Sequence, residues 1–139
     1  DDSIGSDWTQ VGSDILGEYD NAFLGSASTV DLSEDGSTLA IGDFRRKDWT
    51  GCVSVYMLDY KNTWKVLGGE VCGESKVDVM GFSVSLSSNG RTIAVGIMGD
   101  DWLAGRAAVF RYSDNDGEWF QVGDLLVDEG RCRFGWPVS

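Results

Sequence analysis

The loops of this chain place aromatic and acidic residues side by side, a combination suited to ligand recognition. Asp48-Trp49 is followed later by a second pair, Asp101-Trp102, which Asp100 precedes. A tryptophan ring can stack on a sugar while a neighbouring carboxylate accepts its hydroxyl hydrogen bonds. The ring can instead anchor a protein interface with an acidic rim, or fold back over its own sheet. These five residues are the candidate ligand-binding set.

Catalytic chemistry has few candidates in the sequence. Asp78 and Asp100 are the first choice for a glycoside hydrolase pair, but carboxylate pairs are unavoidable in a chain with 23 acidic residues. The chain contains no histidine, and neither a nucleophile elbow nor a phosphate loop is present. We therefore predict a protein that is not an enzyme and assign no catalytic residues.

The charge of the chain excludes two classes of partner. Its net charge is −12, with 11 basic residues, so no basic stripe can displace counterions from a nucleic acid backbone. An acidic membrane surface is disfavoured for the same reason. The sequence also lacks a run of about 18 apolar residues, which predicts no membrane insertion.

The chain contains an internal sequence repeat. A tryptophan followed four residues later by a glycine occurs in three places: Trp8 and Gly12, Trp64 and Gly68, Trp119 and Gly123. A second motif, at 33–42, recurs at 87–96. Periods of about 55 residues are typical of β-propellers, whose repeats bury their faces only against neighbouring repeats. We divide the chain into a lead-in (1–7), repeat 1 (8–63), repeat 2 (64–118) and a truncated repeat 3 (119–139).

The elements that position the candidate loops are predicted to be short strands. In the second copy they span 81–87, 92–98, 106–112 and 118–126. Asp35-Gly36 and Asn89-Gly90 indicate two-residue hairpins, in which both central residues need positive φ. A partial strand is expected at each end, over 8–15 and 134–139. The predicted fold is therefore all-β, with two complete four-stranded antiparallel propeller-type blades and flanking partial strands, in one structural unit.

The motifs W-x-x-x-G, G-x-S-V-x-L-S-x-x-G-x-T-x-A-x-G and G-x-x-x-V-[YF] resemble the FG-GAP-like repeats of secreted and cell-surface β-propellers, including the integrin α-subunit head. The best instance spans 80–87, and Phe134-Gly135 supplies the Phe-Gly pair itself. Leu24-Gly25 departs from the pattern, lying two residues too early. The resemblance implies an extracellular recognition role, with calcium held by acidic loops in some members.

The closest match to such a calcium loop runs from Asp114 to Glu118. Asp114, Asp116 and Glu118 are the candidate ligands. The same Asp-x-Asp-Gly sequence is also a common turn, because aspartate caps its own backbone and glycine takes the left-handed position. Both interpretations remain open, and calcium is the one cofactor considered.

Hairpin symmetry pairs two of the three cysteines. Cys52 opens the third strand of the first repeat and Cys72 closes the fourth, with the turn about halfway between them. We predict a cross-strand disulfide, which indicates an oxidising compartment. Cys132 has no evident partner.

A closed propeller needs about four blades, so further sequence or other copies of the chain must complete this one. We therefore predict a non-catalytic recognition or scaffolding module, extracellular or at the cell surface, that contacts a protein partner or associates with itself. Glycan binding through the loop Asp-Trp pairs is the alternative.

Overall fold

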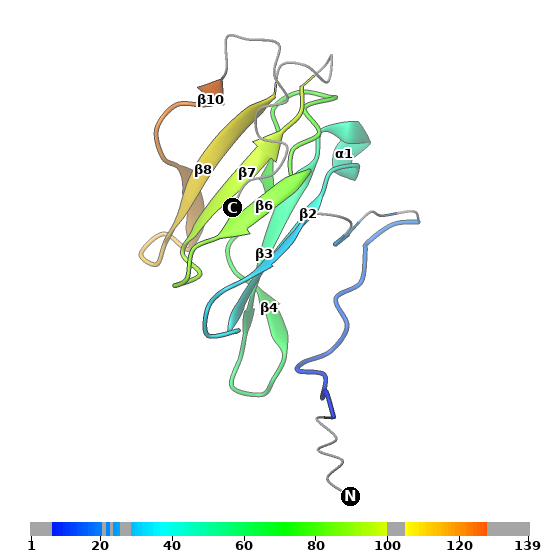
Figure 1. Ribbon diagram of the computed structural model, residues 1–139, viewed down its shortest axis with the longest axis vertical. Helices are drawn as coiled ribbons and strands as arrows, with labels where there is room; N and C mark the ends of the chain where they lie inside the picture. The colour runs from blue at the N-terminus through cyan, green and yellow to red at the C-terminus, as the bar shows by residue number, and fades with distance from the viewer. Residues whose placement is uncertain (1–6, 21, 23, 26–28, 100–104, 128–139) are drawn as a thin grey trace, which may run out of the picture.

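The computed structural model describes residues 7–20, 22, 24–25, 29–99 and 105–127, and it is all-β, as predicted (Figure 1). The described strands form two antiparallel sheets of five strands each. The two sheets follow one another along the chain. The second and third strands of the second sheet each begin 54 residues after their counterparts in the first sheet. None of the helices in the described part is long or apolar enough to cross a membrane.

The first sheet has the order β1-β2-β3, after which β4 and β5 both pair with β3. Its strands are β1 (Val30–Leu32), β2 (Thr38–Asp43), β3 (Cys52–Leu58), β4 (Trp64–Val66) and β5 (Val71–Cys72). A one-turn element, α1 (Arg46–Trp49), lies between β2 and β3. The predicted fourth strand is therefore split into β4 and β5.

The second sheet repeats this plan with the order β6-β7-β8, and β9 and β10 both pair with β8. Its strands are β6 (Ser83–Leu86), β7 (Thr92–Ile97), β8 (Arg106–Ser113), β9 (Glu118–Gln121) and β10 (Leu126–Val127). Each lies within one or two residues of a predicted strand, except that 118–126 is again split in two. The split falls at Gly123, whose φ of 74° is incompatible with an extended strand.

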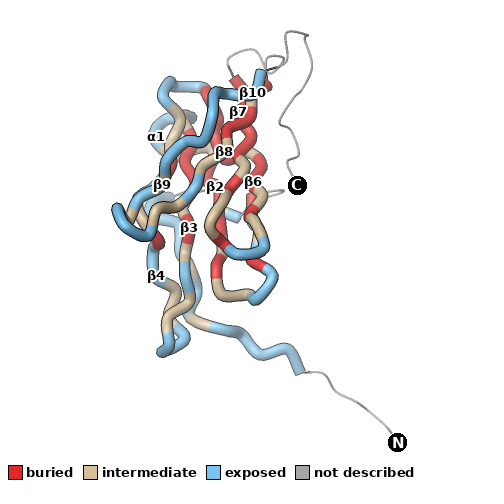
Figure 2. Tube along the Cα trace, turned by 90° about the vertical axis from the view of Figure 1, so that its left-hand side faces the viewer, coloured by how far each residue is buried: buried red, intermediate tan, exposed pale blue. Residues whose placement is uncertain are grey.

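The core lies between the two sheets. Alternate residues of β2 and β3 face alternate residues of β6 and β7, and Ala40, Val53, Ile93 and Val95 are fully buried among them. Buried residues concentrate in these central strands, whereas β4 and β9 are largely exposed (Figure 2). Apolar runs on the central strands are thus explained by burial, while the outer strands keep a wetter face.

The repeated tryptophan-glycine motif locks neighbouring repeats together. Trp119 Nε1 donates to the carbonyl of Leu67 at 2.8 Å, and its ring lies so close to Gly68 that a Cβ there would sit 2.9 Å from Trp119 Cδ1. Gly68 has φ of 74°. The motif needs glycine because the backbone is left-handed and the indole of the next repeat occupies the space of a side chain.

The same contact occurs one repeat earlier. Trp64 Nε1 donates to the carbonyl of Val11 at 3.2 Å, and a Cβ on Gly12 would lie 2.6 Å from that nitrogen. Gly12 has φ of 78°. The repeated tryptophan is therefore an inter-repeat packing residue in both described instances.

One predicted strand at the ends of the series is wrong. Residues 8–15 are described and form no strand, and the Val11 carbonyl of this segment accepts a hydrogen bond from the Trp64 indole. The predicted 134–139 strand lies outside the described residues.

The hairpin turns also differ from the prediction, because only the glycine of each pair has positive φ, 71° at Gly36 and 68° at Gly90. The turns are longer than two residues and are closed by side chains. Asp35 Oδ1 accepts hydrogen bonds from the Ser37 amide at 3.0 Å and from the Ser33 hydroxyl at 2.7 Å. This acceptor role removes the need for a second left-handed residue.

Candidate functional site

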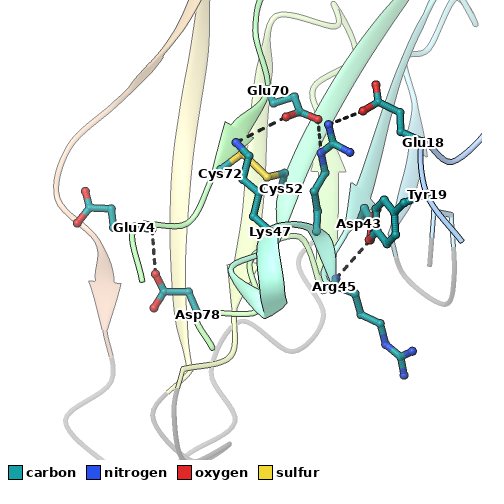
Figure 3. The surroundings of a disulfide bond; sticks show 11 residues. Glu18, Tyr19, Asp43, Arg45, Lys47, Cys52, Glu70, Cys72, Glu74 and Asp78 are labelled. Carbon is teal, nitrogen blue, oxygen red and sulfur yellow. Dashed lines mark hydrogen bonds and ion pairs between the residues drawn. A yellow bond between two sulfur atoms is a disulfide. The ribbon is translucent and has the colours of Figure 1, made fainter. Parts of the chain in front are cut away.

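The predicted disulfide between Cys52 and Cys72 is present and fixes one end of the first sheet (Figure 3). The two cysteines are direct cross-strand partners of β3 and β5. Cys52 is almost fully buried and Cys72 is partly exposed. The covalent link holds β5, and the loop that follows it, against the start of β3.

Basic residues of the β2–β3 connection surround this disulfide. Arg46 forms ion pairs with Glu18 and Glu70, each at 2.6 Å, and Lys47 Nζ lies 3.7 Å from the second oxygen of Glu70. Lys47 Nζ also donates to Cys72 Sγ at 3.1 Å. The segment before β1, the β2–β3 connection and the β4–β5 connection are therefore joined at one point (Figure 3).

Trp49 is presented by an unusual backbone. Lys47, Asp48 and Trp49 are three consecutive non-glycine residues with positive φ, at 53°, 60° and 67°. Such conformations cost about 1–2 kcal/mol per residue and persist only where the surroundings impose them. Here the Trp49 carbonyl accepts the Val79 amide at 3.0 Å, and the Thr50 carbonyl accepts the Met80 amide at 3.0 Å.

The Trp49 ring is partly packed against its own sheet and partly exposed. It packs against Phe44 with ring centroids 6.1 Å apart, and the Arg45 guanidinium lies 4.7 Å from the Trp49 centroid. The residue remains 38% exposed. Trp49 thus partly folds back over its own sheet and still offers an aromatic surface.

Asp48 is engaged in an ion pair. Its carboxylate lies 2.6 Å from Lys76 Nζ, in the β5–β6 connection. The hydrogen bond from Lys76, followed by its charge, lowers the pKa of Asp48. Next to Trp49, therefore, lies a solvent-exposed ion pair between Asp48 and Lys76, in which the Asp48 carboxylate stays ionised.

Asp78 is held by contacts that stabilise its loop. One carboxylate oxygen pairs with Arg106 at 2.6 Å, and the other accepts the amides of Glu74 and Ser75 at 3.0 Å and 2.9 Å. Asp78 is 8% exposed. This arrangement closes the β5–β6 connection, and the carboxylate has its hydrogen-bonding capacity committed to the protein.

Asp43, at the end of β2, is another carboxylate engaged within the protein. The Tyr19 hydroxyl donates a hydrogen bond that is shared between its two oxygens, at 2.8 Å and 2.7 Å. Burial, and then this hydrogen bond, raise the pKa of Tyr19 to about 12. The phenol therefore stays neutral and ties the segment before β1 to the end of β2.

The other predicted site residues are distributed as follows. Asp100, Asp101, Trp102 and Cys132 lie outside the described residues. Asp114 pairs with Arg91 at 3.1 Å. Asp116 accepts the Ser113 hydroxyl at 2.6 Å in the turn before β9. These contacts belong to a side-chain-closed turn, and calcium binding by Asp114, Asp116 and Glu118 stays a prediction.

One cluster of three potential metal ligands occurs in the described part of the chain, formed by Cys52, Glu70 and Cys72. Both of its sulfur atoms belong to the disulfide. A disulfide sulfur carries no thiolate charge, so this cluster is not a metal site in the oxidised protein.

Two pockets near this surface are small. One, beside the disulfide, has a volume of about 110 Å³ and is lined by Leu16, Tyr56 and Glu70 among others. The other, between the sheets near Asp78, has a volume of about 150 Å³. Pockets for small molecules measure about 300–1,000 Å³. These two pockets are therefore too small for a ligand of that size. A third pocket, lined by Glu70 and Trp119 among others, has a volume of about 370 Å³ and falls at the lower end of that range.

Sequence reasoning missed the basic residues of the site. It identified the acidic residues and Trp49, but Arg46, Lys47 and Lys76 provide the ion pairs that place them. The signal was available, because the basic run 45–47 stands directly before Asp48 in a strongly acidic chain. The acidic partner of each of these basic residues is more than 20 positions away in the sequence, and only the fold brings the two together.

Comparisons with known proteins leave the family open: no protein-family model matches the sequence, and no curated protein matches it. The function is therefore argued from the geometry above.

Proposed function

We propose that this chain is a non-catalytic extracellular recognition or scaffolding module, built from FG-GAP-like propeller blades, that binds a protein partner through a surface centred on Trp49. The carrying observation is the run of three left-handed residues that ends at Trp49. A strained backbone retained around an exposed aromatic side chain is a feature of ligand-binding sites.

The rest of the surface supports a protein partner. A rigid, partly exposed tryptophan with a charged rim has the composition of an interface hot spot. Lys76 and Asp48 provide part of that rim, with side chains 76% and 70% exposed.

An extracellular setting is supported by the disulfide. Disulfides persist in oxidising compartments and are rare in reducing ones. The bond joins the outer strand β5 to the central strand β3, next to the loop that carries Trp49, so a reducing environment would loosen the proposed binding surface.

The test is a binding screen of the oxidised full chain against two probe sets: an array of purified cell-surface and matrix ectodomains, and a glycan array. Trp49→Ala should weaken binding to the retained ectodomain by about 30-fold, the size of a hot-spot residue. Tyr60→Ala is the matched control, because Tyr60 is 91% exposed and lies in the β3–β4 turn. It should leave binding unchanged.

The outcomes separate the two functions. Retention on glycans alone, lost in Trp49→Ala, would replace protein contact by lectin-like binding. Ectodomain binding that Trp49→Ala and Tyr60→Ala affect equally would remove Trp49 from the interface. Each variant should unfold cooperatively when monitored by circular dichroism, which shows that a loss of binding does not come from a loss of folding.

A further inference from the structure

The tryptophan-glycine contact between repeats is left half complete at each end of the series. Trp8, the equivalent of Trp64 and Trp119, is 99% exposed. At the other end, a Cβ placed on Gly123 would have no neighbour within 4 Å among the described residues. The described chain thus carries one indole without an acceptor and one acceptor without an indole.

The vacant acceptor already has the conformation of the occupied ones. Gly123 has φ of 74°, against 78° at Gly12 and 74° at Gly68. Gln121 Nε2 donates to the Gly123 carbonyl at 3.0 Å, as Gln10 Nε2 donates to that of Gly12 at 3.3 Å. The glycine is therefore held in its binding conformation without an indole.

The carbonyl that would receive the indole is also in place. The Val122 amide donates to the Val109 carbonyl at 2.8 Å, matching the bond from the Leu67 amide to the Val55 carbonyl at 2.7 Å. Leu67 is the residue whose carbonyl accepts Trp119. Val122 is 41% exposed and is thus accessible to a partner.

We propose that this chain associates head to tail with a second copy of itself, the Trp8 indole of one copy packing on Gly123 of the next and donating to its Val122 carbonyl. Each copy supplies both halves of a contact that its own repeats already make twice. Because donor and acceptor differ, the interface is heterologous and can add copies in sequence. This contact uses residues far in sequence from Trp49 and does not depend on the proposed function.

The test is sedimentation of the oxidised 139-residue chain over a range of concentrations. The Trp8→Ala variant lacks the indole and keeps the acceptor side of the contact. The Gly123→Ala variant keeps the indole, but the methyl group on residue 123 would occupy the space that the partner's indole needs. Each variant alone should sediment as a monomer, with self-association weakened by about 30-fold. An equimolar mixture should form a dimer and no larger species.

Two controls isolate the contact from general effects. Tyr60→Ala removes an equally exposed aromatic side chain. Gly117→Ala places a methyl group on a glycine with φ of 72°, whose nearest neighbour would be the Tyr112 hydroxyl at 3.9 Å, and so reproduces the backbone strain alone. Both controls should associate like the unmodified chain.

Three results would overturn the proposal. One is a wild-type chain that stays monomeric up to about 1 mM, the weak limit of specific contacts. The second is association that persists in both variants, which would place the interface elsewhere on the sheets. The third is a mixture that remains monomeric although the unmodified chain associates. Trp49→Ala should leave this association intact, so its outcome is separate from that of the Trp49 surface.

Discussion

Replacing Gly68 by alanine should test the physical basis of the repeat directly. The new Cβ would lie 2.9 Å from Trp119 Cδ1 and 3.2 Å from Tyr112 Cε2, on a backbone with φ of 74°. The left-handed conformation costs about 1–2 kcal/mol for a non-glycine residue. Displacing the packed ring adds about 1–3 kcal/mol, by analogy with overpacked cores. We expect the free energy of unfolding to fall by about 2–5 kcal/mol.

The assay is equilibrium unfolding in guanidinium chloride, followed by tryptophan fluorescence and by circular dichroism, with linear extrapolation to water. Gly117→Ala has the same backbone strain and no clash, so the difference between the two variants isolates the ring contact. In a Trp119→Ala background, Gly68→Ala should cost less than in the unmodified chain, which is a double-mutant cycle for the pair, and any excess over Gly117→Ala that remains reflects the Tyr112 contact. Equal losses for Gly68→Ala and Gly117→Ala in the unmodified background would refute the packing argument.

Two further predictions concern the disulfide and one turn. Replacing Cys52 and Cys72 by alanine should lower the free energy of unfolding by about 3 kcal/mol, because the disulfide restricts a loop of about 20 residues in the unfolded chain. Denaturation under non-reducing conditions measures this loss, and an unchanged denaturation midpoint would contradict it. Hydrogen bonds from Ser37 and Ser33 lower the pKa of Asp35 to about 2 from 3.8, so the stability it contributes is full above pH 4 and is lost as the pH falls through about 2. In Asp35→Asn, which copies Asn89 of the second repeat, denaturation midpoints should lose that acid dependence, and a retained slope between pH 4 and pH 2 would show that other carboxylates cause it.

The parts of the fold that could be predicted from sequence are those that follow from local pattern. The central strands were located because fully covered strands are apolar along most of their length, as over 39–41 and 93–95. The disulfide was predicted because a hairpin pairs residues equidistant from its turn, and Cys52 and Cys72 are indeed register partners. The first inference needs only the period of a strand. The second also depends on the break between β4 and β5, which shifts the pairing by two residues and places Cys72 rather than Glu70 opposite Cys52.

The β2–β3 connection could not be predicted in this way. No propensity rule places Lys47, Asp48 and Trp49 together in the left-handed region. Ion pairs with Glu18 and Glu70, and the backbone bonds from Val79 and Met80, hold the segment there, and all of these partners are distant in sequence. The conformation of the candidate binding loop is thus a tertiary property.

Three of the described tryptophans, Trp49, Trp64 and Trp119, fall into two groups according to their contacts. Trp64 and Trp119 each donate an indole hydrogen bond to a backbone carbonyl of the preceding repeat and cover a glycine that has no room for a side chain. Trp49 donates no such bond in the described structure, and a strained loop holds it partly exposed. Because the contacts between repeats involve Trp64 and Trp119 and not Trp49, repeats can be joined without covering the Trp49 surface. Assembly and recognition can therefore vary independently, which is why the Trp8 and Trp49 variants are expected to fail in different assays.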